Sequence, residues 1–485
     1  MGNSIKSNVA YNSLLRLMNI IFPLITFPYV ARILLPVGLG KVDFSVSIIQ
    51  YFIILSQLGI PIYAVRECAK VRDNKDKLEK TVQEILAINL VAVVVSYVTF
   101  AILITNLSIF DGYRALLLVL SINIVSTFIG VEWFYQSIEK YKYITVRSAI
   151  VKLVAVISIF IFVRDEKDFI IYGIITALSV SLGNLYNFFY LRKHITILHR
   201  IGNYNFRRHV KPILWLFAMS LSVSIYINLD LVMLGFISGD TSVGYYTAAN
   251  KIIKVVLALI TSVGAVLLPR MSYYVENNDG ARIDDLINKS LNFILMISIP
   301  ASVGIVLLAK PIILIFAGVQ YEESVIVMKL LGPIIVAIAL SNLIGIQILV
   351  SHGKERLTLY STIVGAVVNF SLNIILIPMY SHIGAAIGTL IAEFSVTMVQ
   401  VIFAYEHIRG CVSIKNVLSY LLGGGVIIVT IRIIEDISSN MVSFTLLSIF
   451  FSIIMYFEFL YLIKNNLVVD TVGATKDAIR KKRSR

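Results

Sequence analysis

Long apolar stretches alternate with short polar loops along almost the whole chain, and each stretch is about as long as a bilayer is thick. A membrane-spanning helix needs about 20 predominantly apolar residues. The loops are short, so we expect consecutive helices to run antiparallel. The predicted spans cover residues 11–31, 42–64, 82–105, 115–135, 146–163, 169–191, 211–236, 246–268, 289–309, 325–350, 358–378, 384–405, 416–434 and 441–463.

This pattern predicts an all-α integral membrane protein with about 14 transmembrane helices, in two pseudo-symmetric six-helix lobes plus two C-terminal helices. The longest basic loop, residues 192–211, follows the sixth span and is interpreted as the connector between the lobes. The expected boundaries are 1–200 for the N-lobe (spans 1–6), 201–410 for the C-lobe (spans 7–12), 411–465 for spans 13–14, and 466–485 for a basic cytoplasmic tail.

Polar residues interrupt the second span on one face, at steps of three and four residues, which is the spacing of a helix face. A corresponding stripe follows the eighth span, 204 residues later (43 to 247, 66 to 270). The first stripe comprises Asp43, Ser47, Gln50, Gln57 and Pro61 and ends at Arg66; the second comprises Thr247, Lys251, Lys254, Thr261 and Ala265 and ends at Arg270.

The first and seventh spans also carry polar faces, so four helices from corresponding places in the two lobes share this property. A charge at the bilayer centre costs about 2.5–3.5 kcal/mol, and a water-filled path between the lobes avoids that cost. The residues expected to line this substrate cavity are Arg16, Asn19, Asp43, Ser47, Gln50, Gln57, Ser220, Asp230, Lys251, Lys254 and Thr261.

The basic members of this set have a second interpretation. Lys251 and Lys254 lie less than two turns from the start of their span, so their side chains could instead extend to the membrane interface. Arg16 lies near the expected inner face and could be an ordinary positive-inside residue. Arg66 and Arg270 are candidates for a cytoplasmic gate, with the same alternative because both lie at cytoplasmic helix ends.

The acidic residues in the spans also leave two interpretations open. Asp43 and Asp230 could carry a coupling proton or sodium ion, or could pair with nearby Arg and Lys side chains. Glu132, Glu393 and Glu458 are single acids without sequence-adjacent partners, and we interpret each as a tether within the helix bundle.

Composition excludes a soluble protein, because 58% of the residues are hydrophobic and only 14% are charged, against about 25% in soluble domains. The net charge of +14 comes from basic loops. These loops place both termini in the cytoplasm by the positive-inside rule and give no reason to expect nucleic acid. The tail 476–485 either binds the anionic leaflet or is a disordered solubilising segment.

The two cysteines, Cys68 and Cys411, argue against a disulfide framework and a metal site.

The stretch 27–70 resembles the signature of prokaryotic polysaccharide-export flippases, in the multidrug/oligosaccharidyl-lipid/polysaccharide exporter superfamily. In length, span number and repeat plan, the resemblance covers roughly 1–465. The residues that carry it are Arg32, Leu35, Pro36, Gly38, Gly40, Phe44, Tyr51, Phe52, Gly59, Arg66, Glu67 and Ala69.

The resemblance implies a transporter of the bacterial cytoplasmic membrane, not an enzyme. Its cargo would be an oligosaccharide linked to undecaprenyl pyrophosphate, moved from the inner to the outer leaflet during synthesis of O-antigen, capsule or another surface polysaccharide. Basic residues on the first and eighth helices would hold the pyrophosphate, and Arg16, Lys251 and Lys254 occupy those places. Membrane lipids and the polysaccharide polymerase machinery are the other expected partners, and no cofactor is expected.

Three other functions remain to be weighed. A cation-coupled multidrug exporter of the same superfold would favour acidic and aromatic cavity residues, whereas the expected cavity here is net positive. A membrane polymerase or glycosyltransferase is disfavoured, because the outer loops are short and no metal-binding sugar-nucleotide motif or GxxxxGK[ST] sequence is present. A scaffold role in polysaccharide assembly could accompany transport.

Overall fold

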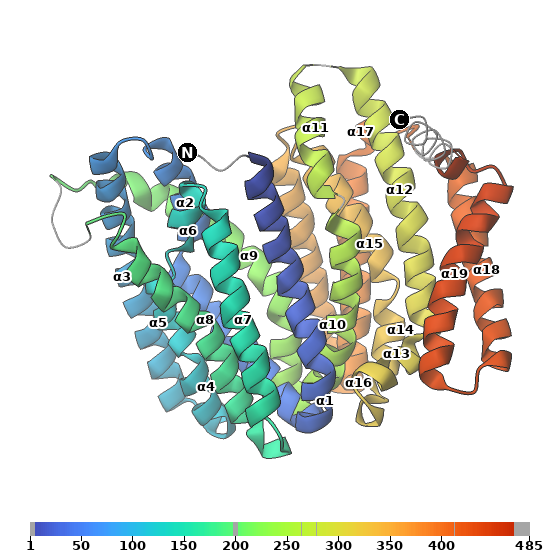
Figure 1. Cartoon of the computed structure of the whole chain (residues 1–485), viewed down its shortest axis with the longest axis horizontal. Coiled ribbons are helices and arrows are strands. Elements are labelled where there is room, and N and C mark those ends of the chain that lie inside the picture. Colours follow the sequence, from blue (N-terminus) through green and yellow to red (C-terminus); the bar gives the residue numbers. More distant parts are fainter. Residues whose placement is uncertain (1–4, 197–201, 263, 278, 412, 470–485) are drawn as a thin grey trace, which may run out of the picture. The chain divides into compact units, whose positions relative to one another are not determined.

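The computed structural model describes residues 5–196, 202–262, 264–277, 279–411 and 413–469, and within these ranges the chain is helical, without a β-strand. Contacts divide it into two compact units, 1–244 and 245–485. The helices of the first unit, shown in blue to green in Figure 1, are α1 (Ile5–Gln57), α2 (Ile60–Lys70), α3 (Lys75–Asn106), η1 (Ser108–Tyr113), α4 (Arg114–Leu120), α5 (Ile122–Ile129), α6 (Glu132–Ser137), α7 (Tyr141–Phe162), η2 (Glu166–Asp168), α8 (Phe169–Leu191) and α9 (Arg207–Ser238).

The second unit begins within α10 and is equally helical. Its elements are α10 (Asp240–Ser262), α11 (Gly264–Glu276), α12 (Gly280–Leu307), α13 (Ala309–Phe316), η3 (Val319–Tyr321), α14 (Ser324–Leu331), α15 (Ile334–Ser341), the π-helix η4 (Asn342–Leu349), α16 (Glu355–Phe403), α17 (Tyr405–Ile408), α18 (Ile414–Ile437) and α19 (Met441–Leu462). The predicted lobe boundaries stay predictions, and the basic segment 470–485 lies outside the described residues.

The all-helical membrane fold is confirmed. In the described part of the chain, 11 helices are long and apolar enough to cross a membrane, or up to 12 if the bent pair Ser324–Leu331 and Ile334–Leu349 is one span. Two of these helical segments, Ala10–Lys70 and Glu355–Phe403, contain 61 and 49 residues. A single crossing needs only about 20 residues, so each is long enough for two, and the total of 14 stays a prediction.

Each of these long segments contains one sharp break. In α1 it falls at Leu35, with φ 58° and ψ 176°, immediately before Pro36. Proline disfavours the helical region for the residue before it, and at Leu35 the chain leaves that region, so the Leu-Pro pair ends one helix and starts the next. The helix continues through Pro23 and Pro28. In α16 the break falls at Ser381, three residues after Pro378.

A reciprocal glycine contact joins the segment after this break to the start of α10. A Cβ atom on Gly40 would lie 1.8 Å from the carbonyl oxygen of Asp240, and one on Gly244 would lie 2.1 Å from the carbonyl oxygen of Pro36. Both partners are backbone atoms, so only glycine fits at either place. Gly40 and Gly244 are 204 residues apart, as are Pro36 and Asp240 (40 to 244, 36 to 240), which is the spacing of the polar stripes.

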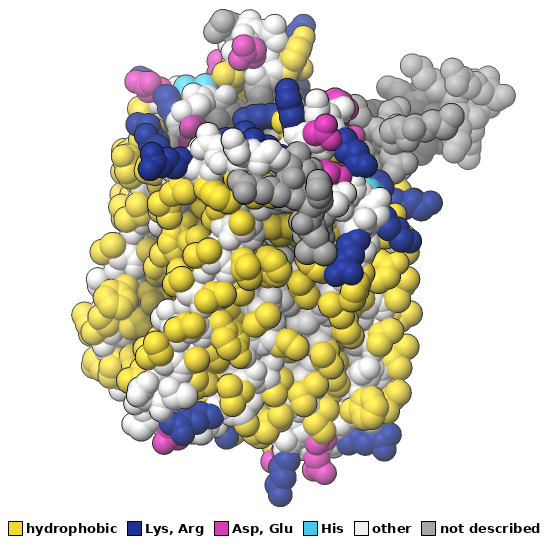
Figure 2. Space-filling view, turned by 90° about the vertical axis from the view of Figure 1, so that its left-hand side faces the viewer, with side chains coloured by type: hydrophobic (Ala, Val, Ile, Leu, Met, Phe, Trp, Pro, Cys, Tyr) yellow, Lys and Arg dark blue, Asp and Glu magenta, His cyan; other side chains and the backbone are white. Residues whose placement is uncertain are grey.

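The outer face of the first unit is suited to a membrane. Figure 2 shows hydrophobic side chains covering the middle of this face, with charged side chains above and below them. In the second unit, α18 and α19 lie side by side and pack on α12 (Figure 1), where the hydroxyl of Tyr456 donates a 2.7 Å hydrogen bond to the carbonyl oxygen of Met296. The last two helices therefore share a hydrophobic core with that unit.

Candidate functional site

A groove of about 600 Å³ with polar and apolar side chains in its lining lies between the second half of α1 and the middle of α9, within the first unit. Three polar residues of α1 and three of α9 line it, together with apolar side chains. The polar lining consists of Asp43, Ser47, Gln50, Ser220, Ser224 and Asn228, and the apolar lining of Val46, Ile54, Ile62, Met219, Val223, Ile227 and Leu231.

The helix repeat explains why these side chains gather. Asp43, Ser47 and Gln50 follow steps of four and three, and the α9 residues follow steps of four, so each set occupies one helix face. Some of the polar groups are already satisfied within their own helices. Ser47 donates a 2.7 Å hydrogen bond to the carbonyl oxygen of Phe44, and Asn228 donates a 3.1 Å hydrogen bond to that of Ser224.

Two half-buried groups in the groove are available to a ligand. Gln50 and Ser220 have no hydrogen-bond partner among the residues that the structure describes. An amide both donates and accepts hydrogen bonds, and so does a hydroxyl. Together with the carboxylate of Asp43, the groove can therefore bind a ligand rich in hydroxyl groups.

The structure brings four of the predicted cavity residues together here: Asp43, Ser47, Gln50 and Ser220. Asp230 is buried elsewhere on α9, within electrostatic range of Tyr51. Gln57 lies further along α1 and does not line the groove. Sequence reasoning missed Ser224 and Asn228, although they continue the four-residue spacing from Ser220.

Arg16 and Asn19 occupy a different place, on the first half of α1 before the break. Both are exposed, and Asn19 accepts a hydrogen bond from Lys152 of α7. Glu132, interpreted as a tether, pairs with Arg147 of α7 at 2.8 Å, as that interpretation requires. Glu458 of α19 is exposed and therefore differs from the expectation of a buried tether.

The remaining predicted residues include the candidate gate. Arg66 is exposed and lies 3.4 Å from Glu67, so in this structure it belongs to a surface ion pair. Lys251, Lys254 and Thr261 lie on α10 in the second unit. Lys251 is half-buried, Lys254 is exposed, and Thr261 donates to the carbonyl oxygen of Leu257 at 2.8 Å. Arg270 is exposed on α11. The cavity shared by all these helices and the gate stay predictions.

One wall of the groove is held by a buried network at the start of α9, which we call the Glu84 anchor (Glu84, Tyr63, Asn205, Arg208 and His209). Glu84 of α3 accepts hydrogen bonds from His209 at 2.8 Å, from Arg208 at 2.5 Å and from the backbone N–H of Asn205 at 2.7 Å. Tyr63 of α2 lies 2.6 Å from the other ring nitrogen of His209. The side chains of Glu84 and His209 are 0% and 1% exposed.

Because an ionised carboxylate only accepts hydrogen bonds, His209 donates through its Nε2–H to Glu84. The Glu84 anchor thus joins α2, α3 and α9, which are separate in sequence. It fixes the entry of α9 into the first unit and with it the position of Ser220, Ser224 and Asn228 across from α1. Neither Glu84 nor His209 was singled out by the sequence.

These features describe a multi-pass helical membrane protein with a groove between two long helices, lined by both polar and apolar side chains. A family model described as "Polysaccharide biosynthesis protein" matches residues 5–275, more than half of the chain, and one described as "MatE" matches residues 216–375. The chain belongs to the polysaccharide biosynthesis protein family, within the multidrug/oligosaccharidyl-lipid/polysaccharide exporter superfamily.

Individual proteins agree with this assignment. The chain is 28% identical over 83% of its length to a protein of Escherichia coli (strain K12) described as "Putative O-antigen transporter", and covers 97% of that protein. It is 22% identical over 53% of its length to a Haloferax volcanii protein described as "Probable low-salt glycan biosynthesis flippase Agl15", and covers 56% of it.

Two solved structures share the fold. The inward closed conformation of the lipid II flippase MurJ gives a TM-score of 0.72 at 19% identity, with 95% of this chain and 99% of that one covered. The inward-facing conformation of a multidrug resistance MATE family transporter gives a TM-score of 0.65 at 15% identity, with 83% and 98% covered. At these identities the likeness shows the fold alone.

Proposed function

We propose that the protein flips a lipid-linked oligosaccharide on undecaprenyl pyrophosphate from the cytoplasmic to the outer leaflet, by alternating access, during synthesis of a surface polysaccharide. The observation that carries the proposal is the polar groove between α1 and α9, in a chain whose family and relatives are named for polysaccharide synthesis and for transport. These relatives are described as transporters and flippases, which supports a function without catalysis.

The chemistry of the groove suits the sugar part of such a cargo. Sugar hydroxyls need both donors and acceptors, and Gln50 and Ser220 supply both. Away from bulk water these hydrogen bonds are electrostatically stronger, because the local dielectric is lower. The pyrophosphate would be bound by cations, for which Arg16, Lys251 and Lys254 remain the proposed residues.

The test is a strain that lacks its own flippase and produces surface polysaccharide only when this chain is supplied. Gln50→Ala combined with Ser220→Ala should reduce the polysaccharide and cause the lipid-linked intermediate to accumulate, at unchanged protein abundance. Ser222→Ala is the matched control, because its hydroxyl is bonded to its own helix at Ala218 and does not line the groove. Full export by the double variant would remove the groove from cargo binding.

The alternative is a cation-coupled multidrug exporter, favoured by the match of the MatE model to residues 216–375. Efflux of a cationic dye from cells that express the protein separates the two functions. We expect no efflux above that of cells without the protein. Dye efflux that depends on an ion gradient, without restored polysaccharide, would establish the alternative.

The proposed direction of transport requires both termini in the cytoplasm of a bacterial inner membrane. Single cysteines at Ser439 and Asn203 test it, in a background in which Cys68 and Cys411 are replaced; both native cysteines are buried. An impermeant thiol reagent should label the cysteine at Ser439 in intact cells and the one at Asn203 only after lysis. The reverse result would invert the topology.

A further inference from the structure

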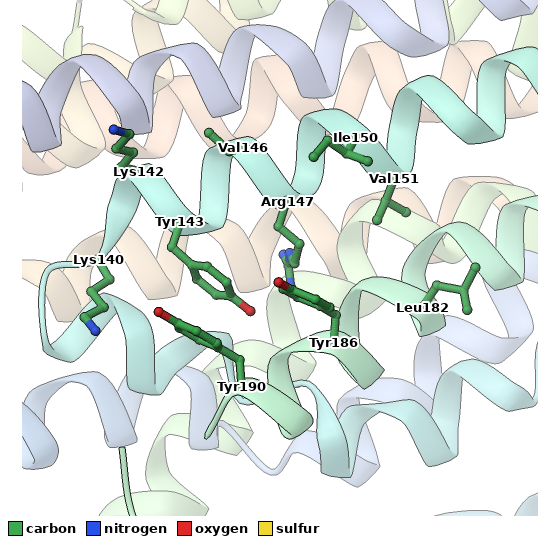
Figure 3. Close-up of a pocket in the computed structure, with 10 residues that line it drawn as sticks. All are labelled: Lys140, Lys142, Tyr143, Val146, Arg147, Ile150, Val151, Leu182, Tyr186 and Tyr190. Carbon is green, nitrogen blue, oxygen red and sulfur yellow. The ribbon is translucent and has the colours of Figure 1, made fainter. Parts of the chain in front are cut away.

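A second groove, of about 690 Å³, lies on the surface of the first unit between α7 and α8 and shares no lining residue with the groove that we assign to cargo. Figure 3 shows its two parts: tyrosine and basic side chains at one end, and aliphatic side chains at the other. The lining residues are Lys140, Lys142, Tyr143, Val146, Arg147, Ile150, Val151, Leu182, Tyr186 and Tyr190.

The polar end is built on three parallel tyrosine rings, which we call the tyrosine stack (Tyr143, Tyr186 and Tyr190). The rings of Tyr143 and Tyr190 lie 4.6 Å apart at 18°, and those of Tyr186 and Tyr190 lie 6.4 Å apart at 5°. Two ammonium groups approach the ring of Tyr190, Lys140 at 5.8 Å and Lys193 at 5.6 Å.

These lysines carry charge that no acid in the described part of the chain neutralises. Lys140, Lys142 and Lys193 form no salt bridge with a described residue. The nearby carboxylates are already engaged: Glu139 pairs with Arg72 at 2.5 Å, and Glu132 pairs with Arg147 at 2.8 Å. The groove therefore keeps a surplus of positive charge at this end.

The surroundings make that surplus costly without an anion. Lys140 donates a hydrogen bond to His194 Nε2, and His194 in turn lies 3.2 Å from the carbonyl oxygen of Tyr190 through Nδ1, as fits a neutral ring. Burial lowers the pKa of Lys140. Burial also lowers the pKa of His194, and the nearby positive charge of Lys140 lowers it further. A bound anion would offset the desolvation of the ammonium group.

The other end of the groove is apolar and open. Ile150 and Leu182 are 59% and 50% exposed, and they lie within helices long and apolar enough to cross a membrane. Exposed aliphatic side chains on such helices can contact acyl chains. A ligand that satisfies both ends must combine a negative head with a hydrocarbon chain.

We propose that this groove binds an anionic phospholipid, with its phosphate on Lys140, Lys142 and Lys193 and one acyl chain along Val146, Ile150 and Leu182. The hydroxyl of Tyr190 lies on the same side of the stack as Lys140 (Figure 3) and can donate to the phosphate. Arg147 positions the groove, because it is held by Glu132 and by the carbonyl oxygen of Gly183 at 2.9 Å and so joins α6, α7 and α8.

The experiment is native mass spectrometry of the full-length protein, titrated with phosphatidylglycerol or with phosphatidylcholine of the same acyl chains. Each basic residue near a lipid surface contributes roughly a fivefold factor in affinity, so Lys140→Gln with Lys142→Gln should weaken phosphatidylglycerol binding about 30-fold. The matched control is Lys77→Gln with Lys80→Gln on α3, which removes the same charge outside the groove and should leave this binding unchanged.

Two further measurements distinguish the contribution of the lipid head group from that of the acyl chain. Leu182→Trp fills the apolar end without changing charge and should also displace phosphatidylglycerol, whereas glycerol phosphate, which has the head group but no chain, should not compete. Three results would each overturn the proposal. They are an equal loss of phosphatidylglycerol affinity in the two lysine double variants, an equal affinity of the protein for phosphatidylcholine, and unchanged phosphatidylglycerol binding in Leu182→Trp. No cargo is present, so the result does not depend on the proposed flippase activity.

Discussion

Replacing Glu84 by alanine should loosen the attachment of α9 to the first unit. The substitution removes the acceptor of three hydrogen bonds and leaves His209, which is 1% exposed, without its anionic partner. Arg208 loses its ion pair too, but its side chain is 48% exposed, so water compensates for much of that loss. The cost therefore arises mainly at His209 and at the backbone N–H of Asn205.

The expected cost is about 2–6 kcal/mol, because the ring N–H of His209 and the backbone N–H of Asn205 each lose their acceptor, at about 1–3 kcal/mol apiece. For a unit of roughly 240 residues, each kcal/mol lowers the melting temperature by about 2–4 °C, so the Glu84→Ala variant should melt roughly 4–24 °C lower. Tyr63→Phe removes a single hydrogen bond to His209 and should cost about 0.5–1.5 kcal/mol.

Intrinsic tryptophan fluorescence of the detergent-solubilised protein can measure the melting temperature of each variant. Trp133 is 5% exposed and lies in the same hydrophobic core as Tyr63, so its emission reports on the region of the Glu84 anchor. The control is Glu435→Ala, which breaks an exposed 3.0 Å ion pair with Arg432 and should change stability by less than about 1 kcal/mol. Equal melting temperatures for the two alanine variants would refute the structural role of the Glu84 anchor.

Three other substitutions give sharp expectations. Gly40→Ala would place a Cβ atom 1.8 Å from a backbone oxygen and should lower protein abundance on immunoblots, whereas Gly112→Ala, with nothing within 4 Å, should not. Lys251→Ala with Lys254→Ala should abolish surface polysaccharide at normal protein abundance. Arginine at both sites should retain the polysaccharide, because the charge of the side chain matters more than its shape. Export by the alanine pair would favour the interfacial interpretation of the two lysines. Asp43→Asn should bind cargo but lose dependence on an imposed ion gradient in vesicles, while loss of abundance instead would identify a structural partner.

Much of the fold follows from local patterns. Apolar length predicts the helices, and the break in α1 falls at Leu35, where the following proline disfavours the helical conformation. The polar lining of the groove could be predicted in part, again from the local spacing of residues. Asp43, Ser47 and Gln50 share a helix face by their spacing, and that spacing, extended from Ser220, would also have found the polar residues one and two turns further along α9.

The Glu84 anchor could not be predicted in the same way. An acid in an apolar helix must have a partner, so Glu84 could have been marked as paired. Its partner His209 lies 125 residues away, however, and any of several basic residues could have satisfied the carboxylate. Glu132 shows the same limit, because its role as a tether was inferred from the sequence, but the identity of Arg147 came only from the structure.

The predicted spacing of 204 residues also relates two glycines that make close backbone contacts in the structure. Gly40 contacts the backbone of Asp240, and Gly244 contacts that of Pro36, so each repeat supplies the small residue where the other supplies a carbonyl oxygen. Gly40 also belongs to the stretch that resembles the flippase signature, and this close crossing gives a physical reason for glycine at that position. Any side chain at Gly40 would separate the start of α10 from the segment that carries Asp43, Ser47 and Gln50.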